Sequence, residues 1–102
     1  MSNLELPKVS VIIPARNEEK FIEKCIESFL TCDYPKELIE VIVVDGMSED
    51  GTRKIVRELS ERDIRVLLVN NEKKITPVAM NLGVKASKGE YIFFSGAHSE
   101  MR

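Results

Sequence analysis

The sequence predicts an α/β fold, an open three-layer α/β/α sandwich built around a mainly parallel sheet. Four short runs of β-branched and aromatic residues alternate along the chain with three stretches that have helical apolar spacing. Each strand and the helix after it occupy about 25 to 30 residues, which is typical of right-handed crossovers between parallel strands. Such crossovers cover both faces of the sheet with helices and so produce the three layers.

The first strand is predicted at residues 9–13, a β-branched apolar run typical of a strand buried on both faces, and Pro14 ends it. In residues 18–30, apolar side chains recur with the spacing of an amphipathic helix. Asn17 stands directly before this stretch and is expected to be the N-cap of the helix.

The second strand is predicted at residues 39–44 and is followed by Asp45. Residues 46–51 are polar and glycine-containing, which indicates a turn. A short helix is expected after this turn, and Ser48 and Asp50 are both candidates for its cap.

The third strand is predicted at residues 66–69, followed by a loop over residues 70–75. Thr76 followed by Pro77 is typical of a cap and the first turn of a helix. This pair therefore predicts a third helix, which we expect to run to about residue 86.

The fourth strand is predicted at residues 90–94, and polar residues follow it as they follow the first two strands. The three polar segments are residues 14–19, 45–50 and 95–98. In open parallel sheets, ligands bind outside the carboxyl ends of the strands. The functional site is therefore expected where these segments meet.

The composition predicts one globular domain over residues 1–102, with 43% hydrophobic and 31% charged residues. The balance of 15 basic against 17 acidic residues gives no overall positive field that would favour a nucleic acid as partner. The apolar runs are much shorter than the roughly 20 residues that span a bilayer, and the first residues do not form a signal peptide. We therefore expect no membrane segment in this chain and a cytoplasmic location.

Two common phosphate-binding loops are absent from the sequence. A dinucleotide-binding fold would carry G-x-G-x-x-G after the first strand, where residues 14–19 are Pro-Ala-Arg-Asn-Glu-Glu. The Gly-Lys-Ser/Thr ending of a P-loop is absent as well. A phospho-accepting receiver domain is also disfavoured, because it needs an acidic pair where Pro14, Ala15 and Arg16 stand.

Three sequence blocks carry a resemblance to a known family. They are VSVIIPARNEEKFIEKCIESFL, VIVVDGMSEDGT and PVAMNLGVKASKGEYIFF, in this order and spacing. Together they closely resemble family 2 glycosyltransferases of the GT-A fold, whose nucleotide-binding half is Rossmann-like. The resemblance implies transfer of a sugar from a nucleoside diphosphate donor, a UDP- or GDP-sugar, with inversion at the anomeric carbon.

Asp45 is the candidate for recognition of the nucleotide base. A carboxylate at the end of the second strand can accept a hydrogen bond from a ring N–H group of a base. The resemblance implies that Asp45 contacts uracil or another base in this way. The alternative is a structural aspartate whose side chain closes the strand in an Asx-turn.

Pro14 and Ala15 begin the loop that wraps the base and ribose in the resembled family, and Arg16 and Glu18 are its polar candidates. For Glu18 the alternative is a carboxylate in a first helical turn, which the helix dipole stabilises without any ligand. Asp50 resembles a second family aspartate, but its place before a helix favours an N-cap.

Asn81 resembles the family asparagine that lies near the donor. Its alternative is a solvated polar residue on a helix face.

The leaving diphosphate must be neutralised, and in the absence of a glycine cradle the expected cofactor is Mn²⁺ or Mg²⁺. The family places a D-x-D or D-A-H motif after the fourth strand, and Gly96 stands here where its first aspartate belongs. Glycine has no side-chain ligand, so the metal would depend on His98, with Glu100 as a nearby carboxylate. The alternative for His98 is a surface or capping histidine.

No general base is found among the 102 residues. In the resembled family it lies downstream, with the acceptor-binding segments and often membrane helices. We therefore expect residues 1–102 to be the nucleotide-sugar-binding part of a transferase for polysaccharide or glycan synthesis, inactive alone, with the parent protein at the cytoplasmic face of the membrane.

Two alternatives to an enzyme fragment remain open. The chain could be a non-catalytic nucleotide-binding module with a degenerate metal motif, or an interaction domain without a ligand. If the rest of a transferase is missing, apolar surface along the fourth strand is left exposed, and the fragment is expected to self-associate.

Overall fold

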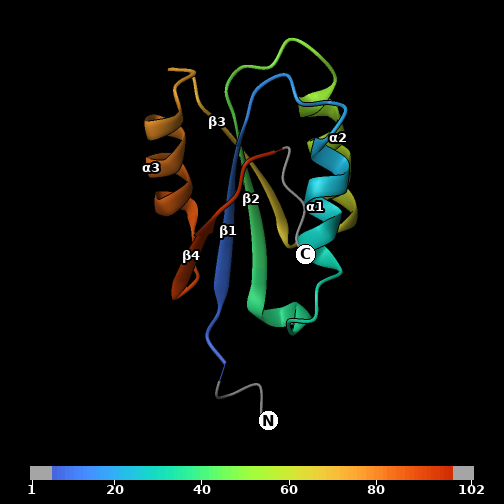
Figure 1. Ribbon diagram of the computed structural model, residues 1–102, viewed down its shortest axis with the longest axis vertical. Coiled ribbons are helices and arrows are strands. Elements are labelled where there is room, and N and C mark those ends of the chain that lie inside the picture. Colours follow the sequence, from blue (N-terminus) through green and yellow to red (C-terminus); the bar gives the residue numbers. More distant parts are fainter. Residues whose placement is uncertain (1–5, 98–102) are drawn as a thin grey trace.

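The computed structural model describes residues 6–97, which form one parallel four-stranded sheet with helices on both faces (Figure 1). The order in the sheet is β3-β2-β1-β4, and each neighbouring pair is parallel. The predicted three-layer α/β architecture is confirmed. The strands are β1 (Val9–Ala15), β2 (Ile39–Asp45), β3 (Val66–Asn70) and β4 (Tyr91–Phe94).

Three α-helices connect the strands. They are α1 (Ile22–Leu30), α2 (Thr52–Arg62) and α3 (Thr76–Ala86), and a short 3₁₀ helix, η2 (Lys36–Leu38), leads into β2. Helices α1 and α2 lie on one face of the sheet and α3 lies on the other (Figure 1). From β1 to β3 the chain moves across the sheet in one direction, and through α3 it returns to the far side of β1. Right-handed crossovers in opposite directions place their helices on opposite faces.

The core has one cluster on each face of the sheet, and β2 contributes to both. Val41 and Val43 pack in the cluster on the side of α1 and α2, whereas Ile42 and Val44 pack with Ala79 of α3. Successive side chains of a strand point to opposite faces, so a strand covered on both sides is apolar throughout. This explains the unbroken apolar run at residues 41–44, within β2.

Strand β1 continues through Pro14 to Ala15, two residues beyond the predicted end. Proline lacks an N–H group and is accepted in a strand where one side has no partner. The pairing with β4 extends only to Ile12, which pairs with Phe94, while β2 accompanies β1 to its end. Pro14 therefore lies beyond the end of β4, where its missing N–H leaves no acceptor unsatisfied in the sheet.

None of the predicted N-caps is correct, because α1, α2 and α3 have Phe21, Gly51 and Ile75 at this position. Helix α1 begins at Ile22, and Asn17, with φ of 54°, lies in the loop before it. The carbonyl of Glu18 accepts the N–H groups of Phe21 and Ile22, which makes a turn ahead of the helix. Thr76 is already inside α3, whose N-cap is Ile75, although the first-turn position of Pro77 is confirmed.

Asp50 stabilises the start of α2 from just outside the helix. The N-cap residue is Gly51, whereas Oδ1 of Asp50 accepts the N–H of Thr52 at 2.9 Å and its hydroxyl at 2.6 Å. Within residues 6–97, no helix is both long enough and apolar enough to cross a membrane.

Candidate functional site

Two pockets adjoin at the carboxyl edge of the sheet, where the loops after the strands lie together (upper part of Figure 1). The first, here called the central pocket, encloses about 310 Å³ of space that is partly open to solvent. Its lining residues are Pro14, Ala15, Arg16, Val44, Gly46, Asn71, Lys74, Ile75, Thr76 and Ala79.

The second pocket, here called the β4 pocket, lies beside the end of β4 and encloses about 700 Å³, again partly open. Its lining residues are Pro14, Glu18, Thr76, Met80, Phe94, Ser95, Gly96 and Ala97. Pro14 and Thr76 line both pockets, so the two hollows are neighbours along the carboxyl edge. An elongated ligand could occupy both.

The structure gathers most of the predicted site residues around these two pockets. Pro14, Ala15 and Arg16 line the central pocket, and Glu18 and Gly96 line the β4 pocket. Asn81 is exposed on α3 and lines neither pocket. His98 lies outside the described residues.

The side chain of Asp45 points away from the central pocket. It is fully buried on the face of the sheet that α1 and α2 cover, and its carboxylate accepts the N–H and hydroxyl of Ser48 and the Nη1 of Arg53. These contacts give Asp45 a structural role of the kind that the alternative interpretation described, although the bonded N–H lies three residues on and not two, as in an Asx-turn. Direct contact of Asp45 with a base would require its side chain to become exposed, and that role stays a prediction.

Two hydrogen-bond chains join the loop after β1 to the loop after β2. The N–H of Asn17 donates to Oγ of Ser48 at 2.9 Å, and this hydroxyl donates to Asp45. The N–H of Glu18 donates to Oγ1 of Thr52 at 2.8 Å, and this hydroxyl donates to Asp50. Each hydroxyl thus links a backbone donor to a carboxylate, an arrangement in which neighbouring bonds strengthen one another.

Side chains of the first loop return further hydrogen bonds to the second. Oδ1 of Asn17 accepts the N–H of Glu49 at 2.8 Å, and Oε2 of Glu19 accepts the N–H of Gly51 at 3.1 Å. Oδ2 of Asp50 in turn accepts the N–H of Glu19 at 3.2 Å. We call these mutual contacts between residues 17–19 and 48–52 the loop clasp. Most polar side chains of the first two sequence motifs therefore bind the two loops to each other, and of the residues in the loop clasp only Glu18 lines one of the two pockets.

The ionisation of Asp50 follows from the loop clasp. Desolvation acts to raise the pKa of this carboxyl, but hydrogen bonds from the hydroxyl and N–H of Thr52 and from the N–H of Glu19 outweigh it. The pKa of Asp50 is therefore lowered from 3.8. An ionised acceptor makes stronger hydrogen bonds than a neutral one, which favours the closed clasp at neutral pH.

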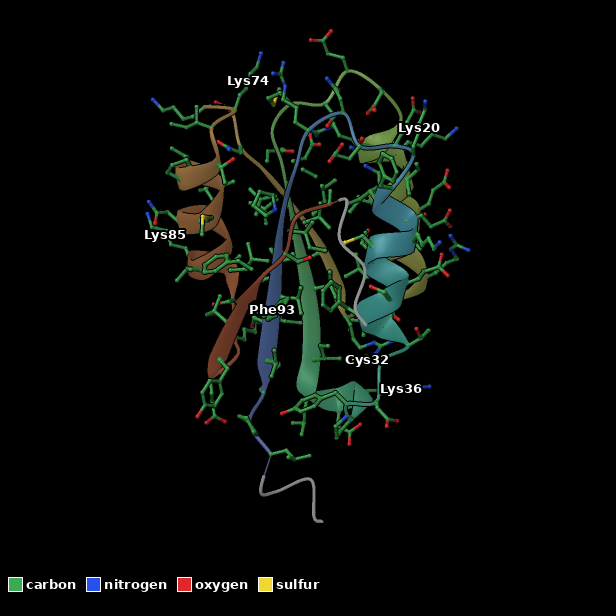
Figure 2. The ribbon with its side chains drawn as sticks, viewed as in Figure 1. Lys20, Cys32, Lys36, Lys74, Lys85 and Phe93 are labelled. Atoms are coloured by element: carbon green, nitrogen blue, oxygen red, sulfur yellow. The ribbon has the colours of Figure 1, made fainter. Side chains whose placement is uncertain are left out.

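The sequence interpretation missed the contribution of the loop between β3 and α3. Asn71 is 2% exposed, and its side chain donates to the carbonyl of Ile75 and accepts the N–H of Lys73. Lys74 has φ of 65° and lines the central pocket, at the end of the molecule that carries these loops (Figure 2). An asparagine directly after a strand is typical of such a side-chain-stabilised turn, and this signal could have identified Asn71.

The two pockets differ in their charged groups. Arg16 and Lys74 both line the central pocket, and Arg16 also lies 3.8 Å from Glu49 in a solvent-exposed ion pair. At the β4 pocket, Sγ of Cys25 lies 3.6 Å from the carbonyl oxygen of Gly96, and Ala97 is buried in the core. The central pocket thus offers positive charge to an anionic ligand, whereas the charged side chain that lines the β4 pocket is Glu18, and the loop after β4 is anchored to α1.

The described residues alone do not provide a site for a divalent metal. Among residues 6–97 there is no group of three or more histidine, cysteine, aspartate or glutamate side chains arranged to hold one. Gly96 contributes only backbone atoms to the β4 pocket. Binding of Mn²⁺ or Mg²⁺ through His98 stays a prediction.

Comparison with known proteins decides the family. Residues 10–102 match the family model described as Glycosyl transferase family 2. The chain belongs to glycosyltransferase family 2. Curated relatives of this family 2 chain include a dolichyl N-acetyl-α-D-glucosaminyl phosphate 3-β-D-2,3-diacetamido-2,3-dideoxy-β-D-glucuronosyltransferase of Methanococcus voltae, 39% identical over 89% of the chain. Glycosyltransferase AglE of Haloferax volcanii is 41% identical over 87% of the chain.

Solved glycosyltransferase structures share the fold of this family 2 chain and confirm the expected GT-A fold. A mannosyltransferase from Pyrobaculum calidifontis, in complex with GDP-Man and Mn²⁺, matches 90% of the chain with a TM-score of 0.79 and 33% identity. TarS of Staphylococcus aureus, residues 1–349, matches 89% with a TM-score of 0.81 and 32% identity. A further structure of the same TarS fragment contains UDP-GlcNAc.

The family 2 chain spans only part of these relatives. It covers 29% of the Methanococcus protein, 30% of AglE and 28% of the mannosyltransferase chain. The match therefore concerns the part of each relative that corresponds to the sheet and pockets described above.

Proposed function

We propose that this chain is the donor-binding part of an inverting glycosyltransferase that transfers a sugar from a nucleoside diphosphate sugar to an acceptor hydroxyl in glycan or polysaccharide synthesis. The observation that carries the proposal is the pair of adjoining pockets at the carboxyl edge, which share Pro14 and Thr76. A nucleoside diphosphate sugar has a base at one end and a diphospho-sugar at the other, and this shape suits two connected hollows. Complexes of structural neighbours with GDP-Man and UDP-GlcNAc support the same donor class.

The base is assigned to the central pocket. Pro14 and Ala15 give it an apolar wall, and the backbone of Gly46 approaches from the end of β2. Arg16 and Lys74 line the same pocket and can attract the negative charge of the nucleotide. Asp45 contributes here through the turn that orients Gly46, and its direct contact with the base remains a prediction.

The ribose and diphospho-sugar are assigned to the β4 pocket, beside Glu18, Ser95 and Gly96. Once bound, a divalent cation would neutralise the leaving diphosphate. The Mn²⁺ in the mannosyltransferase complex supports metal use in this fold, but Gly96 supplies no carboxylate. We therefore expect Mn²⁺ to strengthen nucleotide binding, but only modestly. Asn81 is exposed, and a contact between it and the donor remains a prediction.

Gly96 also favours a second candidate, a nucleotide-binding module that has lost the transfer reaction. Calorimetric titration of the chain with UDP and GDP, with and without Mn²⁺, distinguishes these possibilities. Binding that Mn²⁺ strengthens supports the donor site of an enzyme, and binding that ignores Mn²⁺ supports the module. A dissociation constant weaker than about millimolar, which means a binding free energy less favourable than about −4 kcal/mol, would contradict both candidate functions.

The Gly96→Asp variant tests the assignment of the loop after β4. An added carboxylate at this position should strengthen Mn²⁺-dependent binding, because metal-bound diphosphate would gain an oxygen ligand. Ser95→Asp is the matched control, since it adds the same charge one residue earlier. Equal effects of the two substitutions would show that Gly96 does not face the metal. Sugar transfer by residues 1–102 alone would contradict their expected inactivity.

A further inference from the structure

Arg53 lies in the first turn of α2, on the side of the sheet opposite the central pocket. Its Nη1 is 3.1 Å from Oδ2 of Asp45 and 2.6 Å from Oδ1 of Asn70. Asp45 and Asn70 are register partners at the ends of β2 and β3, so Nη1 of Arg53 links α2 to the ends of both strands. We propose that Arg53 is a positioning residue of the central pocket, which holds the ends of β2 and β3 in the arrangement that receives the nucleobase.

The burial of the ion pair between Asp45 and Arg53 explains why loss of Arg53 should disturb the central pocket. The side chain of Asp45 is 0% exposed and that of Arg53 is 27% exposed. Ser48 provides neutral donors to the carboxylate, and Arg53 provides positive charge. Removal of the cation leaves a buried carboxylate with the hydrogen bonds of Ser48 but without a counter-charge, which is more costly than loss of an exposed pair. Without Arg53, Asp45 is expected to move toward water and open the turn that it closes.

The backbone of Asp45 transmits such a movement to the pocket. Val44 and Gly46, its neighbours in the chain, both line the central pocket. Its carbonyl accepts the N–H of Asn71 at 2.7 Å, and Asn71 lines the pocket as well. A shift of Asp45 therefore displaces the wall formed by β2 and the wall formed by the loop after β3.

The inference rests on the proposed function, because it concerns the pocket to which the base is assigned. The test compares Arg53→Met with Arg57→Met, which removes the same charge from an exposed position one turn later in α2. In calorimetric titrations with UDP and GDP, Arg53→Met should weaken binding by about tenfold or more, and Arg57→Met by less than about twofold. Wild-type affinity in Arg53→Met would overturn the inference.

The conservative variant Arg53→Lys separates positioning from general damage. The ammonium of lysine has three donors at one nitrogen and can contact both acceptors, as Nη1 does. Arg53→Lys should therefore recover much of the affinity that Arg53→Met loses. The same loss in both variants would contradict a role based on charge and hydrogen bonding.

A double-mutant cycle with Asp45→Asn tests whether Arg53 acts through Asp45. With the carboxylate neutralised, removal of Arg53 no longer leaves a buried charge, so its effect on affinity should become much smaller. Equal effects of Arg53→Met in the two backgrounds would show that Arg53 acts by another route.

Amide hydrogen exchange without nucleotide decides the inference independently of the proposed function. The N–H groups of Ser48 and Asn71 donate to Asp45, so they should exchange faster in Arg53→Met than in the wild type. Their exchange rates should not change in Arg57→Met. The N–H of Ile42, in the middle of β2, should stay protected in both variants. Unchanged exchange at Ser48 and Asn71 would overturn the inference. If the wild-type chain binds neither nucleotide, the proposed function fails and the exchange result still stands.

Should Arg53→Met fail to fold, Asn70→Ala provides the same comparison, because it removes only the exposed acceptor. It should speed exchange at Asn71, and unchanged exchange there would count against the inference.

Discussion

Asn17 shows how a motif residue can serve the architecture of a site. Its φ of 54° places it in the left-handed region, its N–H donates to Ser48, and its side chain accepts the N–H of Glu49. Asparagine tolerates this conformation better than most residues and carries the acceptor that the second loop needs.

Substitution of Asn17 should separate these two contributions. Asn17→Gly keeps the left-handed backbone and loses the acceptor, so it is expected to lower the free energy of unfolding by about 1 kcal/mol. Asn17→Ala also introduces backbone strain and should cost about 1 kcal/mol more. Urea unfolding of the two variants measures the difference, and equal stabilities would contradict strain at this position.

Asp63 is predicted to make the free energy of unfolding depend on pH in the acid range. Its side-chain hydrogen bond with Arg65 is the main reason that the pKa of this carboxyl is lowered from 3.8, against a smaller effect of desolvation. The unfolded chain therefore binds the proton first as the pH falls. The stabilisation is complete above pH 3.8, the ordinary pKa of the carboxyl, and it disappears as the pH falls through the lower pKa of Asp63 in the folded protein.

The Asp63→Asn variant should lose this contribution, about 1 kcal/mol at neutral pH for a pair at the surface whose side chains are partly buried. Its unfolding free energy should approach that of the wild type in strong acid. Asp33→Asn, at an exposed position, is the matched control. A constant difference between Asp63→Asn and wild type across the acid range would exclude the pair as the cause.

Side-chain direction limited what the sequence could predict about the site. The polar ends of the strands located the carboxyl edge, and Pro14, Ala15 and Arg16 do line a pocket there. Asp45 stands at the same edge, but strand alternation gives it the face of Val43, which α1 and α2 cover. Which face holds the pocket depends on where α3 packs, and the residues around Asp45 do not encode that.

At the scale of elements, β4 is one of the two edge strands of the sheet and carries exposed aromatic side chains. Tyr91, Phe93 and Phe94 on this strand are 64%, 51% and 42% exposed. Phe93 (Figure 2) contacts Phe29 of α1 with ring centroids 5.8 Å apart. An edge strand with unpaired backbone groups and exposed aromatic residues favours association with another strand.

We therefore expect the isolated chain to self-associate through β4. Tyr91→Lys should reduce association, because a charged side chain on an edge strand opposes pairing. Ile64→Lys is the control, since Ile64 is 98% exposed and lies before β3, at the opposite edge of the sheet. Sedimentation equilibrium over a range of concentrations measures the effect. Equal reduction by both substitutions would point to general solubility.

Helix α3 packs against β1 at Gly83. A Cβ added there would clash with Cγ2 of Ile12, so either the Ile12 side chain or the helix must shift to accept a larger residue. Gly83→Ala should lower stability by about 1 to 3 kcal/mol through overpacking, despite the higher helix propensity of alanine. Val84→Ala, at the next and exposed position, should change it by less than about 1 kcal/mol. Thermal unfolding of both variants makes the comparison, and a stabilised Gly83→Ala would contradict the close approach.

At the scale of the whole molecule, the sequence predicted the strands and helices in their correct order because each has a distinct apolar period. The start of α1 was placed too early because Glu18 and its neighbours satisfy helical spacing while their backbone and side chains bond to another loop. Such contacts between distant segments leave no periodic signal. The order β3-β2-β1-β4 likewise depends on the paths of the crossovers, which local patterns do not specify.

The reversal of strand order at β1 explains where the pockets form. Crossovers leave β1 in one direction and arrive at β4 in the other, so the loops at their carboxyl ends separate on either side of β1. Pro14, at the end of β1, is accordingly shared by the central pocket and the β4 pocket. The fold thus creates the hollow, and the loops determine which ligand it accepts.

The loop clasp has a consequence for protein engineering. Residues 17–19 and 48–52 exchange donors and acceptors with each other, so neither segment is satisfied without its partner. Transplanting one segment from a relative would leave donors or acceptors unmatched, whereas transplanting both would preserve the pairing. The two segments therefore form one interchangeable unit, and a chimera that changes either loop should be built by replacing them together.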